Sequence, residues 1–501
     1  MTIILDGSHL TIEELALIAG EDPAVVELAP EGVKRVHDAR AVVMEALERG
    51  DSVYGLTTGL GSRAGEKLGA DALAEFSYQT IRGRAHAIGE PLSIPIVRAA
   101  MAVRLNTLLK GGAGADIAVV ECLQQCLNRG LIPVIGEVGS IGAGDLCWGA
   151  TLGLALIGEG QMFDQKGAVA DSLAVMQAAG ITPLSLGPRD GLALANHSSF
   201  SAAMMALGVN RASRMMESIQ SAAALSMEAF MANLTPLDPI AAEMRPQPGQ
   251  SVAAQQLLDL LQGSPILNTA NARRLQDPLS MRNVTEVHGA GIATLDFARD
   301  AAENEINGAS DNPVVDLAQR RIISCGAYHT PLLSIAAQTL SNAFVHVATT
   351  QLSRIVKLLT ERFSGLPQYL AAPGSNSNGF APVLKIAEAL VAELSHAAMP
   401  VPVWPSVNAD GVEDIQTNAP VAIKALDRVV ANAESLCAIE LIVASQAYEL
   451  RGNAESAPRV KSMFKRVREV SATLEQDRPL TKDIESVAKQ VQAGCYLLDS
   501  H

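Results

Sequence analysis

Long stretches with helical spacing of apolar residues constrain this chain most strongly. Between residues 211 and 231 the apolar positions recur every three or four residues, the spacing of one face of an α-helix. Comparable stretches follow at 333–363, 380–399 and 420–452, and the loops between them are rich in Pro, Gly, Asn and Asp. We therefore expect a mainly α fold with a long central helical bundle.

The N-terminal part differs, because glycine-rich segments interrupt shorter helical patterns. Thr11 and Glu14 form a capping-box pattern ahead of a short helix. Residues 51–68 hold many glycines and no helical period, which predicts a loop. A turn near residue 190 divides the predicted chain into a smaller α-rich N-terminal domain, residues 1–190, and a helical-bundle domain, residues 191–501.

Composition excludes several classes of protein. Of the 501 residues, 48% are hydrophobic and 18% are charged, which is too apolar for a disordered chain. The net charge is −15 and only 3% of residues are aromatic, whereas nucleic-acid binders combine a basic balance with aromatic side chains. The scarcity of aromatic residues also predicts a core of small side chains, which suits closely packed helices.

No segment of the sequence marks a secreted or membrane-spanning protein. The N-terminus lacks the positive region and cleavage site of a signal peptide, and the longest apolar runs are shorter than a membrane span. The 6 cysteines are scattered, as in a reducing compartment, and no histidine pair adds metal-ligand spacing. We expect a cytoplasmic protein that binds no metal ion, nucleic acid or membrane.

Four segments place polar residues in glycine-rich or loop settings, and their order and spacing carry a resemblance. They are YGLTTGLG at 54–61, GSIGAGDL at 139–146, GLALANHSS at 191–199 and QDPLSMR at 276–282. Further patterns support them, namely VRAA from Val97, RLNTLL from Arg104, EINGASDNP at 305–313, GAYH at 326–329, GLP at 365–367 and ED at 413–414.

Together, these segments resemble the aromatic amino acid ammonia-lyase family, which includes histidine and phenylalanine ammonia-lyases, over residues 35 to about 430. The resemblance implies the mainly α fold, a small-molecule substrate and a homotetramer whose active sites draw loops from more than one chain.

The cofactor segment departs from the family pattern. Members carry an Ala-Ser-Gly triplet that cyclises into a methylidene-imidazolone electrophile, with the serine supplying the methylidene carbon. Here the stretch reads Gly142, Ala143, Gly144, Asp145, so the serine is absent and the segment is one residue short. Leu279 stands where the family has a tyrosine close to the electrophile. We therefore expect a degenerate cofactor loop at residues 142–144 and no imidazolone.

Other family positions are retained. The resemblance makes Tyr54 the base that takes the β-proton, Arg282 the arginine that grips the substrate carboxylate, and Asn196 a hydrogen-bonding neighbour of that carboxylate. Glu413 falls where histidine-type members place a carboxylate for the imidazole ring, and Tyr328 matches an aromatic position in the family. A tyrosine has an ordinary pKa near 10 and needs a cationic or hydrogen-bonding environment to act as a base near neutrality.

Loss of the electrophile predicts a substrate with its own good leaving group. A quaternary trimethylammonium has no lone pair to add to the electrophile, and it leaves as a neutral amine. The chain thus resembles the ergothionase branch, which eliminates trimethylamine from ergothioneine. A cation or hydrogen-bond donor near the thio-imidazole would stabilise the charge that develops there; Lys385 is the first candidate, and Arg84 or His86 the second. Arg63 and Lys67 add positive charge to the Tyr54 loop.

Several alternatives stay open from sequence alone. Lys385 is nearly as well explained as a surface lysine, and only one of Arg84 and His86 is expected to touch substrate. The protein as a whole could be a histidine or aromatic amino acid ammonia-lyase that obtains the electrophile by another route. It could also be a catalytically silent homologue that acts as a scaffold or binding protein.

Overall fold

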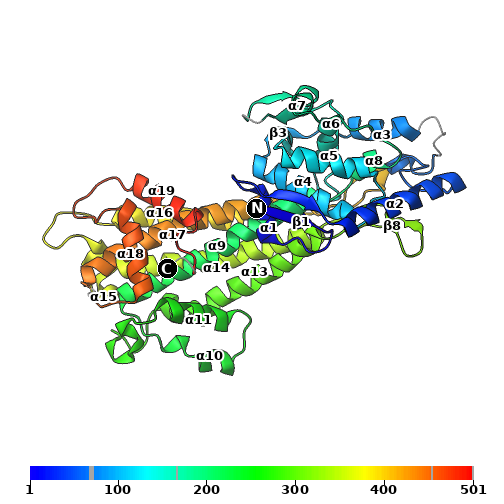
Figure 1. The fold of residues 1–501 in the computed structure, drawn as a ribbon. Coiled ribbons are helices and arrows are strands. Elements are labelled where there is room, and N and C mark those ends of the chain that lie inside the picture. The colour runs from blue at the N-terminus through cyan, green and yellow to red at the C-terminus, as the bar shows by residue number, and fades with distance from the viewer. Residues whose placement is uncertain (67–72, 165–166, 453–454, 499–501) are drawn as a thin grey trace. The chain divides into compact units, whose positions relative to one another are not determined.

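The computed structural model describes residues 1–66, 73–164, 167–452 and 455–498. Within them the chain divides into two units (Figure 1). Unit 1 comprises residues 1–210, 299–337 and 401–423, and unit 2 comprises residues 211–298, 338–400 and 424–501. Unit 1 therefore contains residues 191–210, 299–337 and 401–423, which the boundary predicted near residue 190 assigns to the second domain, because each unit is assembled from segments distant in sequence.

Unit 1 combines short helices with small sheets. Its helices are α1 (Ile12–Ala19), α2 (Pro30–Arg49), α3 (Leu73–Arg82), α4 (Ile94–Leu109), α5 (Ile117–Asn128), α6 (Leu146–Leu156), α7 (Ser172–Ala178) and α8 (Asp190–Ala195). Its strands are β1 (Thr2–Leu5), β2 (Val25–Leu28), β3 (Ile88–Pro91), β4 (Ile132–Pro133), β5 (Gly136–Val138), β6 (Gln161–Phe163), β7 (Val169–Asp171), β8 (Val314–Asp316) and β9 (Arg321–Ile323).

The strands pair in small groups. β1 and β2 are parallel, whereas β3 with β5, β4 with β6 and β7, and β8 with β9 are antiparallel. Each strand spans at most 4 residues, too short to display an alternating pattern in the sequence. The pairing of β3 with β5 matters for the site, because β3 follows the Arg84 segment and β5 precedes the glycine loop at 139–145.

α4 forms the centre of unit 1. Every residue from Val97 to Leu109 is buried, as expected of a helix surrounded by neighbours on all sides. α1, α2 and α5 pack against it, and α8 packs against α3 and α6 (Figure 1). The expected capping box opens α1, with the Thr11 hydroxyl accepting the Glu14 N–H and the Glu14 carboxylate accepting the Thr11 N–H.

Unit 2 consists of helices and connecting loops among the described residues. Four helices contribute residues to both units: α9 (Ser199–Phe230), α13 (Val284–Ile306), α14 (Pro331–Leu359) and α17 (Ala419–Arg451). The others in unit 2 are α10 (Pro239–Met244), α11 (Gln250–Leu260), α12 (Leu279–Arg282), α15 (Glu361–Ser364), α16 (Ala381–Ala397), α18 (Pro458–Val470) and α19 (Thr481–Gln492). The long helical stretches predicted from periodicity are confirmed.

Apolar and polar groups are both buried in unit 2. The predicted stripe of α9, from Met215 to Phe230, is buried, which confirms its assignment to the core. Two apolar helical stretches, 190–230 and 419–451, each have a most apolar window that is 83% buried, as in core helices. Within this core the guanidinium of Arg354 pairs with Glu440 at 2.6 Å, and both side chains are fully buried.

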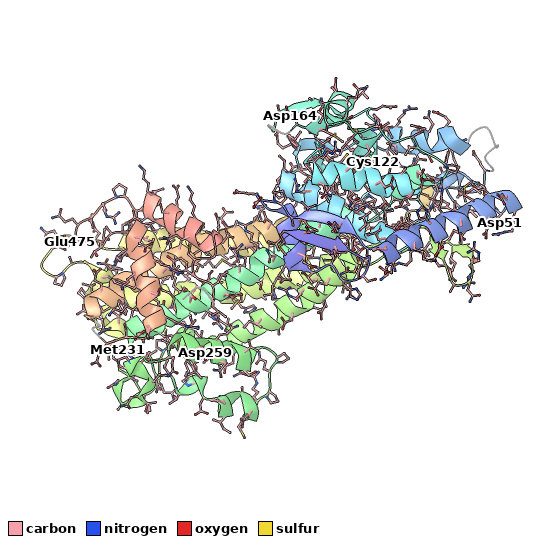
Figure 2. The ribbon with its side chains drawn as sticks, viewed as in Figure 1. Asp51, Cys122, Asp164, Met231, Asp259 and Glu475 are labelled. Atoms are coloured by element: carbon pink, nitrogen blue, oxygen red, sulfur yellow. The ribbon has the colours of Figure 1, made fainter. Side chains whose placement is uncertain are left out.

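The cysteines and the buried histidines have structural surroundings. Cys122 (Figure 2) and Cys126 are buried in α5 and form no disulfide. His197 and His288 are fully buried, and burial lowers the pKa of both imidazoles well below the ordinary value. They are neutral core side chains.

Candidate active site

Polar side chains from separate segments of unit 1 converge on one cavity of about 230 Å³. This volume lies below the roughly 300–1,000 Å³ of pockets for drug-sized ligands and therefore indicates a small substrate. The lining residues are Tyr54, Leu60, Gly61, Ser62, Arg84, Ala143, Leu146, Leu192, Asn196, Asn312, Tyr328, Ala409 and Glu413.

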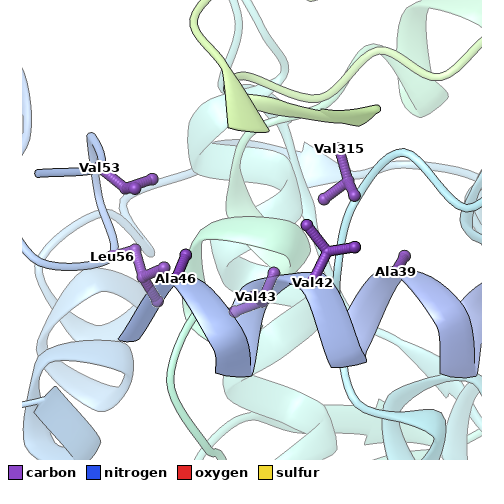
Figure 3. Close-up of a cluster of buried hydrophobic side chains, with 7 residues drawn as sticks. All are labelled: Ala39, Val42, Val43, Ala46, Val53, Leu56 and Val315. Atoms are coloured by element: carbon purple, nitrogen blue, oxygen red, sulfur yellow. The ribbon is translucent and has the colours of Figure 1, made fainter. Parts of the chain in front are cut away.

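The Tyr54 loop follows α2 and is anchored by apolar side chains on both sides of the tyrosine. Val53 and Leu56 belong to a buried cluster with one face of α2 and with Val315 (Figure 3). The Thr57 hydroxyl accepts the Val53 N–H at 2.8 Å and fixes the turn. The loop is thus held by the core of unit 1, although it has no regular secondary structure at Tyr54.

The Tyr54 hydroxyl is held by a backbone donor and lies near a cation. It accepts the Gly61 N–H at 3.1 Å. Arg84 lines the same cavity, and its guanidinium interacts electrostatically with Tyr54. A donated N–H and a nearby cation both stabilise a phenolate. This arrangement suits a tyrosine that accepts a proton.

Arg84 follows the last turn of α3 and is half-buried. One guanidinium N–H group donates to the Thr80 carbonyl at 3.3 Å. Burial lowers the pKa of Arg84, although the charges of Tyr54 and Glu413 oppose this shift. His86 is exposed and does not line the cavity. Of the two candidates that the sequence offered, the structure brings Arg84 into the site.

The degenerate cofactor loop, residues 142–144, needs glycine at both of its ends. Gly142 and Gly144 have φ of 76° and 80°, in the left-handed region. A Cβ on Gly142 would lie 1.9 Å from the Thr417 hydroxyl oxygen, and one on Gly144 would lie 2.6 Å from the Asn196 side-chain oxygen. Of the three residues, Ala143 lines the cavity.

Asp145 anchors the loop through buried hydrogen bonds. Its buried carboxylate accepts the Ser140 hydroxyl at 2.7 Å, and both the N–H and the hydroxyl of Ser201 at 2.7 Å. Burial raises the pKa of Asp145, although these hydrogen bonds act in the opposite direction. Ser140 thus serves the loop as a structural hydroxyl.

A buried ion pair supports the Asn196 side of the cavity. Arg104 on α4 pairs with Asp311 at 2.7 Å, and the two side chains are 0% and 1% exposed. The Arg104 guanidinium also donates to the Ala193 carbonyl on α8, three residues before Asn196. Asp311 directly precedes the lining residue Asn312. One pair therefore holds two walls of the cavity.

Tyr328 and Glu413 complete the convergence. The Tyr328 carbonyl accepts the Gly144 N–H at 3.0 Å, and Ala143 forms an isolated antiparallel bridge with His329. Burial, then the charge of Glu413, raises the pKa of the Tyr328 phenol, which keeps it neutral as a hydrogen-bonding group. Glu413 is partly exposed and lies opposite Asn408 in a second isolated bridge.

Two further predicted residues are not brought into this cavity. Arg282, at the end of α12, bonds to the Gln276 side chain, and its Nε is buried without a partner. Lys385, on α16, is exposed and forms no hydrogen bond or ion pair with a described residue. Both belong to unit 2. Lys67 lies outside the described residues, and Arg63 pairs with Glu66 at 2.7 Å.

Sequence reasoning did not single out several lining residues. Leu60, Ser62, Leu146, Leu192 and Ala409 bear no chemical signal, because apolar and small side chains become pocket walls only through the fold. Asn312 differs from these residues because a sequence motif contains it. Its side-chain oxygen accepts the Cys325 N–H at 2.9 Å. Asn312 lies inside the EINGASDNP pattern, which had pointed to it as part of a motif.

Other features of the described residues lack comparable chemistry. A larger cavity of about 550 Å³ in unit 2, lined by residues between Leu237 and Leu258, contains Glu243 as its one charged side chain. No group of three or more His, Cys, Asp or Glu side chains in the described part of the chain is placed to hold a metal ion. The convergence of tyrosine, arginine, asparagine and glutamate therefore identifies the 230 Å³ cavity as the candidate active site.

Comparisons with known proteins agree with this fold. The family described as aromatic amino acid lyase matches residues 10–469. A histidine ammonia-lyase of Anaeromyxobacter sp. (strain K) is 35% identical over 505 aligned residues, covering 98% of this chain and 99% of that protein.

Two solved structures extend the comparison. The ergothioneine-degrading enzyme ergothionase of Treponema denticola, solved with desmethyl-ergothioneine sulfonic acid, superposes with a TM-score of 0.94 at 26% identity, covering 99% of this chain and 100% of that one. Histidine ammonia-lyase of Trypanosoma cruzi superposes with a TM-score of 0.91 at 29% identity, covering 99% and 94%. This chain is an enzyme of the aromatic amino acid lyase family.

Proposed function

We propose that this enzyme eliminates trimethylamine from ergothioneine, or from a closely related betaine, without a methylidene-imidazolone. The observation that carries the proposal is the glycine loop. Residues 142–144 contain no side-chain hydroxyl, so no residue of the loop can lose water to form a methylidene. Cyclisation of the loop into an imidazolone would consume the Gly144 N–H. Here that N–H donates to the Tyr328 carbonyl at 3.0 Å. The residues present do not fit the family electrophile.

The leaving group decides which substrate such a site can process. A primary α-ammonium leaves as neutral ammonia but is a poor leaving group, and losing a proton makes it poorer still; the family electrophile adds to the amine and assists its departure. A trimethylammonium departs as a neutral amine without further help. The similarity to ergothionase of Treponema denticola supports this substrate class, whereas the name histidine ammonia-lyase, borne by the more identical relatives, supports the alternative.

The chain's own residues supply acid–base chemistry and binding. Tyr54 removes the β-proton, the electrons of the C–H bond form the C=C bond, and the C–N bond breaks to release trimethylamine. Arg282 and Asn196 bind the carboxylate, an interaction for which the guanidinium fork is well shaped. Glu413 receives the N–H of the thio-imidazole ring.

Lys385 and Arg84 have electrostatic roles in this proposal. Removal of the β-proton places negative charge on the thio-imidazole, and a cation at the ring stabilises it. Lys385 takes this role. Arg84, which lines the cavity beside Tyr54, stabilises the phenolate form of the base.

We further propose that the enzyme is a cytoplasmic homotetramer whose sites are completed by partner copies. Arg282 and Lys385 do not line the cavity formed by unit 1. Large apolar side chains beside them are exposed, with Leu279 at 59% and Ile386 at 51%. Exposed apolar surface next to functional groups that lie outside the cavity is typical of an interface. Light scattering during size-exclusion chromatography tests the subunit count, and four subunits is the expected result.

One experiment separates the two lyase activities. Purified protein is incubated with ergothioneine or with histidine, and the conjugated acid, trimethylamine and ammonia are followed; the intact mass is measured on the same sample. We expect trimethylamine and thiourocanate from ergothioneine, no ammonia from histidine, and the mass of the unmodified sequence. Ammonia from histidine and a mass lower by two waters would overturn the proposal in favour of a histidine ammonia-lyase.

A further inference from the structure

The backbone carbonyl of Gly142 is the meeting point of three segments that line the candidate active site. It accepts the Thr417 hydroxyl at 3.0 Å, the Thr330 hydroxyl at 3.2 Å and the Thr330 N–H at 3.3 Å. Both threonines are buried, with exposures of 4% and 2%. A carbonyl oxygen has two lone pairs, so three donors on one oxygen make this an unusually constrained position.

Thr417 is joined to the loop by its backbone as well. The N–H groups of Thr417 and Asn418 donate to the Ile141 carbonyl at 3.2 and 2.9 Å. The Thr417 hydroxyl accepts the Ala419 N–H, the first of α17, at 3.2 Å while it donates to Gly142. Its hydrogen-bonding capacity is thus used in both directions, which fixes its rotamer.

The positions of these contacts give them functional weight. Thr417 lies four residues after Glu413, and Thr330 lies two residues after Tyr328. Ala143, which lines the cavity, directly follows the clamped carbonyl. Moving the Thr417 hydroxyl would therefore displace the Glu413 segment from the glycine loop and from the Tyr328 segment. Displacements of about 1 Å at a site that orients substrate cost up to about a hundredfold in rate.

We propose that Thr417 is a positioning residue, whose hydroxyl fixes Glu413 relative to the glycine loop and Tyr328 and thereby sets the ring-binding geometry of the site. The inference rests on the proposed function, in which Glu413 binds the ring. It also explains the packing at Gly142, because the Thr417 hydroxyl occupies the space where any side chain at that position would begin.

Two substitutions isolate the hydroxyl. Thr417→Val preserves the shape of the side chain and removes the hydrogen bonds, whereas Thr417→Ser preserves the hydroxyl. Thr360→Val is the matched control, since its hydroxyl donates to a backbone carbonyl of α14 at 2.7 Å and does not line the candidate active site. With ergothioneine we expect T417V to lower kcat/KM by about tenfold or more, and T417S and T360V to stay within about threefold of wild type.

A double-variant cycle separates positioning from plain structural support. If Thr417 acts through Glu413, adding T417V to Glu413→Gln should cost little further activity, since the group that it positions is already disabled. An additive loss in the double variant would overturn the proposal. So would a T417V enzyme with wild-type kcat/KM, or a T417S enzyme as impaired as T417V.

The inference can be tested even if the proposed substrate is wrong. Amide hydrogen exchange needs no substrate, and T417V should speed exchange in peptides covering residues 139–146 and 408–418, whereas T360V should not. Unchanged exchange in both peptides would contradict the clamp. A wild-type enzyme that does not turn over ergothioneine would contradict the proposed function alone, and changed exchange would then still support the clamp.

Discussion

The functional residues of unit 1 and unit 2 differ in how well the chain itself holds them. In unit 1, Tyr54, Arg84 and Asn196 line one cavity and rest on buried hydrogen bonds and ion pairs. In unit 2, Lys385 is exposed without a partner among the described residues, and the Nε of Arg282 is buried without one. Unit 1 contains a prearranged part of the proposed site. In our proposal, Arg282 and Lys385 of unit 2 complete the site of a partner copy.

This contrast separates two kinds of functional side chain. A base must be held close to the hydrogen atom that it removes, and packing and hydrogen bonds within one folded unit can hold it there. Groups that contact the substrate from the opposite side can be supplied at an interface, which forms only when the oligomer does.

The prearranged part should contain the residue most sensitive to substitution. Tyr54→Phe removes the base and retains the ring, so we expect kcat for ergothioneine to fall by about a thousandfold, within the range of general base catalysis. Trimethylamine release measures it. Tyr78→Phe, which alters a hydroxyl that accepts the Leu186 N–H outside the cavity, serves as the control and should retain activity. A Tyr54→Phe enzyme with near wild-type turnover would remove the tyrosine from the mechanism and favour a catalytically silent homologue.

The buried ion pair behind the cavity should contribute to the free energy of unfolding. Arg104→Met removes the hydrogen-bonded partner of the buried Asp311 carboxylate, and removing one partner of such a pair costs about 3–5 kcal/mol. Lys34→Met, which breaks an exposed pair with Asp38, should change the free energy of unfolding by less than about 1 kcal/mol. Denaturant unfolding measures both. Equal, small effects would mean that the two walls of the cavity do not depend on the buried pair.

Lys385 should show the opposite behaviour, a loss of activity without a loss of stability. Lys385→Met removes the ring cation, and we expect kcat/KM to fall by about a hundredfold while the melting temperature stays unchanged. Lys461→Met, at another exposed lysine on a helix of unit 2, is the matched control and should change neither. If the two variants behave alike, Lys385 is an ordinary surface lysine.

A smaller effect concerns a buried acid near the glycine loop. Burial, together with the charge of Asp145, raises the pKa of Glu305 to about 7 from an ordinary 4.5. An acid with a raised pKa in the folded state stabilises the fold below its unfolded pKa, and this contribution is lost as the pH rises through about 7.

Glu305→Gln keeps this position neutral at every pH. We therefore expect the variant to exceed wild type in stability by about 1–2 kcal/mol at pH 8 and to match it near pH 4, as judged by thermal unfolding. A constant difference at both pH values would show that the substitution acts through packing instead.

Sequence reasoning reached the long helices and most of the chemical groups of the site. Periodicity over many turns identifies helices such as α14 and α17, whereas strands of 2 to 4 residues are too short to show an alternating pattern in the sequence. Motif positions led to Tyr54, Arg84 and Glu413, which line one cavity. They did not distinguish Arg84 from His86, because the choice depends on how the chain turns after α3.

The remaining parts of the site depend on contacts between distant segments. Asn312 and Leu192 line the cavity because the buried ion pair of Arg104 draws their segments together, which no local pattern reveals. The role of Thr417 is of the same kind, since its partner at Gly142 is 275 residues away in sequence. The positions of Arg282 and Lys385 are harder still to predict, because their proposed contacts lie on other copies of the chain.

The most direct test of a site shared between chains mixes two inactive variants. Tyr54→Phe and Lys385→Met chains with different tags are co-expressed, and oligomers that contain both are purified and assayed with ergothioneine. A site that takes Tyr54 from one chain and Lys385 from another is intact in such mixtures, so random assembly should restore about a quarter of wild-type activity. Activity no higher than that of the separate variants would show that Tyr54 and Lys385 act within one chain and would contradict the account.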